Sequence, residues 1–205
     1  MTIPTASNFL ELRHASTARA IFVVAPERRF LAVDGIGDPA AADFRYATSA
    51  LHTVADIVLQ RLRRAGIATA TRAGVAECLW WPPQPLSPGE LPAAFADRTS
   101  WHWRQLIELP GQAAETDALA AIDEARRGAG RDLALVRRLD LTEGSAAQML
   151  HVGPLSAEPV TLRMLFDGIA EANLRPEGRL HTLVLTDANV SPQGIGRSIL
   201  RQPVA

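Results

Sequence analysis

The chain has 205 residues, of which 47% are hydrophobic and 21% are charged, and its formal net charge is −1. A chain of this length can bury one substantial core, or two smaller cores built from a repeated unit, without disulfide or metal support. A net charge this close to zero lacks the positive field on which nucleic-acid binding depends, so we expect no direct nucleic-acid partner.

The residue types narrow the chemistry further. All 21 lysine and arginine positions are arginine, which excludes a lysine Schiff base, a pyridoxal phosphate anchor and a phosphate-loop lysine. The five histidines show no pairing at metal-ligand spacing, and the single cysteine, Cys78, lies in an apolar run typical of a small buried hydrophobe. We therefore expect neither a cofactor nor a metal site.

The N-terminal segment lacks the basic start and continuous apolar block of a secretory signal, and no stretch has the length and apolar character of a bilayer span. We expect a cytoplasmic protein that makes no membrane contact.

The first half of the chain predicts a strand, a helix and two strands. Residues 30–37 form a short apolar run that ends in a glycine turn, and an amphipathic helix follows from Ala47 to a stop at Gly66. Residues 75–81 and 101–109 are rich in aromatic and aliphatic side chains and predict two strands, with a proline-rich loop between them.

A helix from Thr116 and a strand at residues 133–139 connect this half to the second, where the opening pattern returns. The second half predicts a strand at 146–152, a helix around Leu162 to Ile169, and strands at 181–185 and 199–202.

We therefore predict an α+β fold of duplicated strand-helix-strand-strand units with pseudo-two-fold symmetry and a central ligand cleft. Residues 1–29 would form an N-terminal extension and residues 30–205 one small-molecule-binding domain, with halves at about 30–110 and 145–205. We expect the cleft on the helix-free faces of the strands.

The tryptophans are the main candidates for the cleft. Because successive strand residues point to opposite faces, Trp81 shares a face with Glu77, whereas Trp80 is expected on the helix-packed side. Trp101 and Trp103 lie two residues apart and project together, so they could form a stacking platform beside Trp81. The alternative is that these rings simply belong to the core.

Glu77 is the main candidate for an acid in the site. A lone carboxylate in so apolar a run is either exposed on the strand or buried in a site, and burial beside tryptophan would raise its pKa and suit it to general acid or base chemistry. His181, at a strand start, either satisfies backbone groups or reaches the pocket rim.

Several segments in order, FLAVDGIGDP, ALHTVADIVLQRL, AECLWW, WHWRQLIELPG, EGSAAQMLHVGP with Glu158, and LTD followed by ILRQPV, make the chain similar to the GyrI-like small-molecule-binding proteins. These are stand-alone relatives of the effector-binding domains of multidrug-responsive transcription regulators. The resemblance implies the duplicated fold and a central cleft lined by aromatic and acidic residues, with Glu77 and the four tryptophans at matching positions.

Members of that family bind hydrophobic, often cationic or planar compounds, and some hydrolyse cyclopropane-bearing genotoxins. The sequence departs from the family on its closing strand, where Thr182 and Val184 replace a glutamate and a tyrosine. Both positions share a face, so one wall loses an acid and a phenol together.

The leading hypothesis is therefore a protein that binds a bulky apolar or planar xenobiotic or metabolite. The alternatives are a hydrolase of cyclopropane-bearing genotoxins, with Glu77 activating water, and a protein inhibitor of DNA gyrase.

Overall fold

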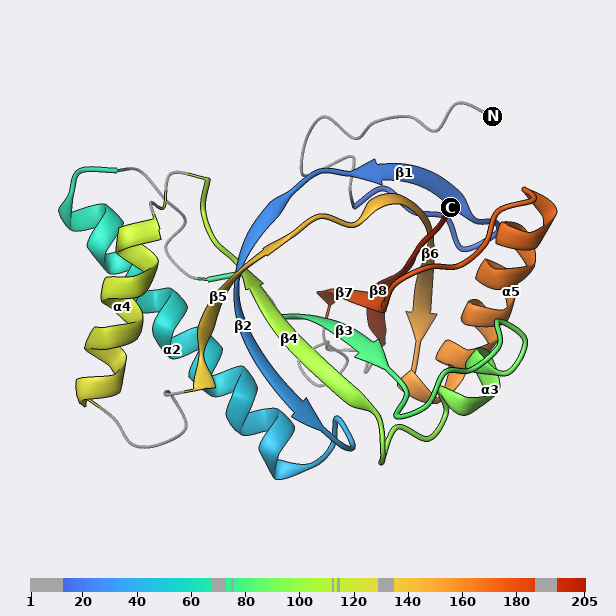
Figure 1. The fold of residues 1–205 in the computed structure, drawn as a ribbon, viewed down its shortest axis with the longest axis horizontal. Coiled ribbons are helices and arrows are strands. Elements are labelled where there is room, and N and C mark those ends of the chain that lie inside the picture. Colours follow the sequence, from blue (N-terminus) through green and yellow to red (C-terminus); the bar gives the residue numbers. More distant parts are fainter. Residues whose placement is uncertain are drawn as a thin grey trace.

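The computed structural model describes residues 13–67, 73–74, 76–111, 113, 115–128, 135–186 and 195–205. These residues form one strongly curled antiparallel sheet with helices on its outer side (Figure 1). No helix within the described part of the chain is both long enough and apolar enough to cross a lipid bilayer.

Two strand-helix-strand-strand units follow one another along the chain. The first consists of β2 (Arg28–Ile36), α2 (Ala42–Arg64), β3 (Glu77–Trp81) and β4 (His102–Glu108). The second consists of β6 (Gly144–Gly153), α5 (Glu158–Glu171), β7 (Leu180–Thr186) and β8 (Gly196–Pro203). The strands of each unit lie in the same order, β2-β4-β3 and β6-β8-β7, and the units meet where β3 pairs with β7. The predicted duplicated α+β fold is confirmed.

Two further strands complete the sheet, and each pairs with the unit that it does not lead into. Strand β1 (Ile21–Ala25) leads into β2 but pairs with β6, whereas β5 (Arg137–Leu141) leads into β6 but pairs with β2. This exchange draws the two sheet edges toward each other at the β1–β2 and β5–β6 connections, and the sheet curls (Figure 1). Strand β1 lies within the residues expected to form an extension, so the sheet begins before residue 30.

Helix α2 buries one face at three- and four-residue steps, including Leu51, Val54, Val58 and Leu62, as its sequence predicts. It begins at Ala42 rather than Ala47, and the additional turn places the Phe44 ring on the sheet. It ends at Arg64, and Gly66 follows with a φ of 79°, a left-handed conformation that favours glycine.

The helices cover the sheet in two groups (Figure 1). Helix α2 packs on β2 and β4 and is itself covered by α4 (Glu115–Gly128). Helix α5 packs on β6 and β8, and the single turn α3 (Leu91–Ala94) packs against it. The central strands β3 and β7 therefore lie between the two helical groups.

Candidate functional site

The two faces of the sheet carry different side chains. On β3, Glu77 and Trp81 point to the inner face, whereas Cys78 and Trp80 point to the outer face beneath the helices. This alternation follows the sequence prediction. Burial raises the pKa of the Cys78 thiol well above its usual range, as expected of a buried apolar-like side chain.

The predicted grouping of Trp103 with Trp81 is wrong. In the β3–β4 pair Trp103 lies opposite Trp80, and Trp81 lies opposite His102. Because opposite residues share a face, Trp103 belongs to the outer, helix-covered face rather than to the helix-free face. Trp101 precedes β4 and is buried in the same outer cluster.

The other predicted site residues divide between the same two faces. Thr182 lies opposite Cys78 and Val184 opposite Ser198, which places both on the outer face. His181 lies on the inner face, where its ring contacts Glu77. The outer face therefore collects Trp80, Trp101, Trp103, Thr182 and Val184, and the inner face collects Glu77, Trp81 and His181.

Five rings pack together on the outer face; we call Phe44, Trp80, Phe95, Trp101 and Trp103 the aromatic cluster. The Phe44 ring stacks on Trp80 with centroids 5.7 Å apart and meets Trp103 edge-on at 5.1 Å. Phe95 is edge-on to both Trp80, at 6.0 Å, and Trp101, at 5.3 Å. These are favourable aromatic geometries, and the cluster joins α2 and the segment around α3 to the centre of the sheet.

Gly35 makes room for one of these rings. It lies opposite Trp103 on β2, and a Cβ at this position would lie 2.1 Å from Cζ2 of the indole. A side chain there would displace Trp103. The glycine within the apolar sequence of β2 is therefore explained by packing, because it leaves room for the Trp103 indole.

A buried ion pair borders the aromatic cluster. Arg98 Nη1 lies 3.1 Å from Glu158 Oε2, and the Glu158 side chain is fully buried. The Arg98 guanidinium also lies over Phe95, 4.2 Å from the ring centroid, and over Trp80, at 5.0 Å. Burial raises the pKa of Glu158, although Arg98 and His151 oppose that rise.

Polar atoms on this face are left without partners. Among the described residues, three such buried atoms without a hydrogen bond come from the outer face: Trp80 Nε1, Trp103 Nε1 and Thr182 Oγ1. They come from the adjacent strands β3, β4 and β7. Buried polar atoms are normally paired, so such a concentration marks a place where a partner molecule could supply the missing contacts.

The inner face holds a compensated network of charges instead. Arg28 contacts Glu77 at 3.3 Å, Glu143 at 3.4 Å and Glu108 at 3.3 Å. Glu143 also contacts Arg201, with Nη1 and Oε2 2.8 Å apart. Arg13 also contacts Glu77 at 3.3 Å, so three arginines balance three carboxylates within the curl of the sheet.

The predicted rise in the pKa of Glu77 is wrong for this reason. Burial alone would raise the pKa, but His181, Arg28 and Arg13 outweigh it and lower the pKa to about 2. Glu77 is therefore a carboxylate held by cations, which is a poor general acid and a poor base at neutral pH.

Trp81 is half-buried on the inner face and is already covered by polar side chains. Its ring stacks on His102 with centroids 5.6 Å apart, and the Arg179 guanidinium lies 3.9 Å from the ring centroid. It is separate from the aromatic cluster.

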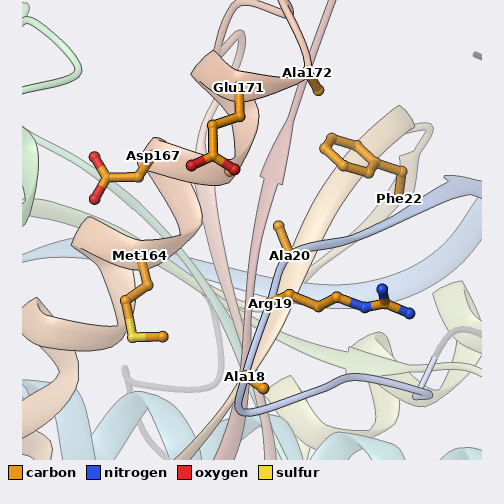
Figure 2. A pocket seen from close by; sticks show the side chains of 9 residues that line it. Ala18, Arg19, Ala20, Phe22, Met164, Asp167, Glu171 and Ala172 are labelled. Carbon is orange, nitrogen blue, oxygen red and sulfur yellow. The ribbon is translucent and has the colours of Figure 1, made fainter.

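A groove of about 450 Å³ lies elsewhere, between α5 and the chain that enters β1. Figure 2 shows Met164, Asp167 and Glu171 of α5 on one side and Ala20 and Phe22 on the other. Gly168 allows this approach, because a Cβ there would lie 2.8 Å from the Ala20 Cβ. No member of the aromatic cluster lines this groove.

Sequence reasoning did not identify Phe44, Phe95 or Arg98 as parts of the site. Nor did it identify Glu158, which opens α5, and Glu143, which directly precedes β6, as buried members of ion pairs. A carboxylate that opens a helix gives no local sign that it is buried. Its partner Arg98 is distant in sequence and comes near through the tertiary fold.

The solved structures of known proteins include several with this fold. An uncharacterised conserved protein from Listeria innocua is 24% identical, with full coverage of both chains and a TM-score of 0.83. A hydrolase from the same organism is also 24% identical, with 96% of each chain covered and a TM-score of 0.75. The C-terminal domain of EcmrR is 10% identical, covers 91% of this chain and 97% of that chain, and has a TM-score of 0.56.

No protein-family model and no curated protein matches the sequence. The structural likenesses support the GyrI-like fold that the sequence indicates. At these identities they establish the fold, and function must be argued from the site.

Proposed function

We propose that the chain binds a bulky apolar or planar small molecule on the outer face, in the position that Phe44 now occupies against Trp80 and Trp103. The observation that carries this proposal is the set of unpaired buried polar atoms on the adjacent strands β3, β4 and β7, which are Trp80 Nε1, Trp103 Nε1 and Thr182 Oγ1. A ligand that stacks on the indoles and reaches these atoms would gain apolar contact and satisfy stranded polar groups.

Phe44 is suited to be displaced. It is half-buried at the start of α2, and its ring lies 10° from parallel with the Trp80 indole. Its backbone is held, because Gln105 Nε2 donates to the Phe44 carbonyl at 2.7 Å. The ring can therefore rotate away about its side-chain bonds while the helix start stays in place.

The inner face is less suited to an apolar ligand. Glu77, Glu143, Arg28 and Arg201 already pair with one another there, and separating them would expose buried charges. On the outer face Trp80 and Trp103 are buried beneath Phe44, so a ligand there would have to displace an apolar ring rather than separate paired charges.

Hydrolysis is a second candidate because a similar Listeria structure bears the name hydrolase. In this chain the buried carboxylate that borders the aromatic cluster is Glu158, and it is paired with Arg98. The positions of the family's glutamate and tyrosine are Thr182 and Val184. The side chains therefore favour binding over turnover.

Isothermal titration calorimetry with 10-methylacridone, a planar three-ring ketone, tests the proposal. We expect Trp103→Phe to weaken binding about tenfold through loss of ring contact. Trp81→Phe is the matched variant on the inner face and should bind with unchanged affinity, whereas Phe44→Ala should bind more tightly.

The opposite ranking of the two tryptophan variants would place the ligand on the inner face. Absence of binding for 10-methylacridone, for the 10-methylacridinium cation and for triphenylphosphine oxide at millimolar concentration would overturn the proposed function. Recovery of chemically altered ligand would replace binding with catalysis.

A further inference from the structure

We infer that the outer-face site selects a neutral ligand that carries a hydrogen-bond acceptor and rejects cations, because Arg98 already fills the cationic position against the aromatic rings. This inference rests on the proposed function and names the class of ligand for the same site.

Arg98 occupies the position where a cationic ligand would bind the aromatic rings. Cations bind favourably over the faces of tryptophan and phenylalanine, and the guanidinium lies over both Trp80 and Phe95. Its side chain is buried, with 9% exposure, so the contact is largely shielded from water. The site thus contains its own cation.

The carboxylate beside the rings, Glu158, is already paired. A buried carboxylate attracts a cationic ligand when it has no counter-charge, but Glu158 forms an ion pair with Arg98 at 3.1 Å. A ligand cation would meet the Arg98 charge in a poorly screened environment, where like charges repel strongly. The ion pair therefore removes the attraction and adds a repulsion.

The unpaired polar atoms on this face are all able to donate a hydrogen bond. The indole nitrogens of Trp80 and Trp103 can act as donors but not as acceptors, and the hydroxyl of Thr182 can also donate. These groups therefore call for an acceptor such as a carbonyl or ether oxygen on the ligand.

Two probes with one skeleton separate the alternatives. The ketone 10-methylacridone is neutral and has a carbonyl acceptor, whereas 10-methylacridinium has the same three rings, a positive charge and no oxygen. By calorimetry at pH 7 we expect the wild-type chain to bind the ketone at least about tenfold more tightly than the cation.

Variants of Arg98 test the cause of this preference. Arg98→Met removes the internal cation and should shift the ratio of the two dissociation constants toward 10-methylacridinium by about tenfold or more, whereas Arg98→Lys should keep the wild-type preference. Arg104→Met, which removes an arginine that pairs with Asp34 on the inner side, is the matched control and should leave the ratio unchanged.

The outcomes of these titrations distinguish failure of the inference from failure of the proposed function. Equal or tighter binding of the cation by the wild-type chain overturns this inference but leaves the proposed function standing, whereas absence of binding for both probes and for triphenylphosphine oxide removes the proposed function itself. An unchanged ratio in folded Arg98→Met also overturns the inference. Should Arg98→Met fail to fold, the ratio of the two dissociation constants in Arg98→Gln is compared with the wild-type ratio instead.

Discussion

His181 on β7 and Glu143, in the turn before β6, are joined by a 2.8 Å contact between Nδ1 and Oε1. The other ring nitrogen, Nε2, lies 3.2 Å from Glu77 Oε2 on β3. One buried imidazole thus connects carboxylates from both repeated units. The inner-face network therefore links the two units through side chains.

The first prediction concerns the dependence of stability on pH. The pKa values of Glu77 and Glu143 lie below their ordinary 4.5, because cationic partners outweigh burial, so their stabilisation is present above pH 4.5 and is lost as the pH falls. The pKa of His181 lies above its ordinary 6.5, because Glu143 and Glu77 outweigh burial, so its stabilisation is present below pH 6.5 and is lost as the pH rises through the raised value.

We therefore expect the free energy of unfolding, measured by urea denaturation, to be highest between about pH 5 and 6.5 and to fall on both sides. His181→Gln should remove the decline on the alkaline side, whereas His52→Gln on α2 should keep it. A wild-type profile that is flat from pH 6 to 9 would contradict this account.

The second prediction concerns Arg28, which contacts Glu77, Glu143 and Glu108. Arg28→Met should lower the free energy of unfolding by about 3 to 5 kcal/mol, because it leaves buried carboxylates without a counter-charge. The more exposed pair of Arg104 and Asp34 is the matched case, and Arg104→Met should cost about 1 kcal/mol or less. Similar losses in the two variants would show that the inner network is not especially stabilising.

The third prediction concerns the slot for Trp103. Gly35→Ala would place a Cβ 2.1 Å from the indole, so the ring must move, and we expect a loss of about 2 to 3 kcal/mol in urea denaturation with an altered tryptophan emission spectrum. Gly89→Ala is the control, because an added Cβ there meets nothing within 4 Å. An unchanged emission spectrum in Gly35→Ala would mean that the Trp103 position is more adaptable than its packing indicates.

The fourth prediction separates stability from binding at Thr182. Its buried hydroxyl has no partner, so Thr182→Val should raise the free energy of unfolding by about 1 kcal/mol while weakening 10-methylacridone binding. Thr48→Val provides the contrast, because the Thr48 hydroxyl donates to Gln105 Oε1 at 2.6 Å, and its loss should cost about 1 kcal/mol. Destabilisation by Thr182→Val would show that the hydroxyl is paired in solution.

Local patterns in the sequence determined most of the elements of this fold. The three- and four-residue steps of Leu51 to Leu62 specify a helix, and alternation along β3 separates Trp80 from Trp81, because both properties depend on residues near in sequence. Strand β1 and the single turn α3 were not predicted, since each is too short to show a clear period.

Tertiary structure decided which residues meet. The pairing of β3 with β4 places Trp103 opposite Trp80, and no pattern within either strand specifies that register. The same holds for charge: the sequence predicted that burial would raise the pKa of Glu77, but Arg13, Arg28 and His181 reach it from distant elements and lower it. Periodicity is a short-range property of the chain, whereas strand register and electrostatic partners depend on contacts between segments far apart in sequence.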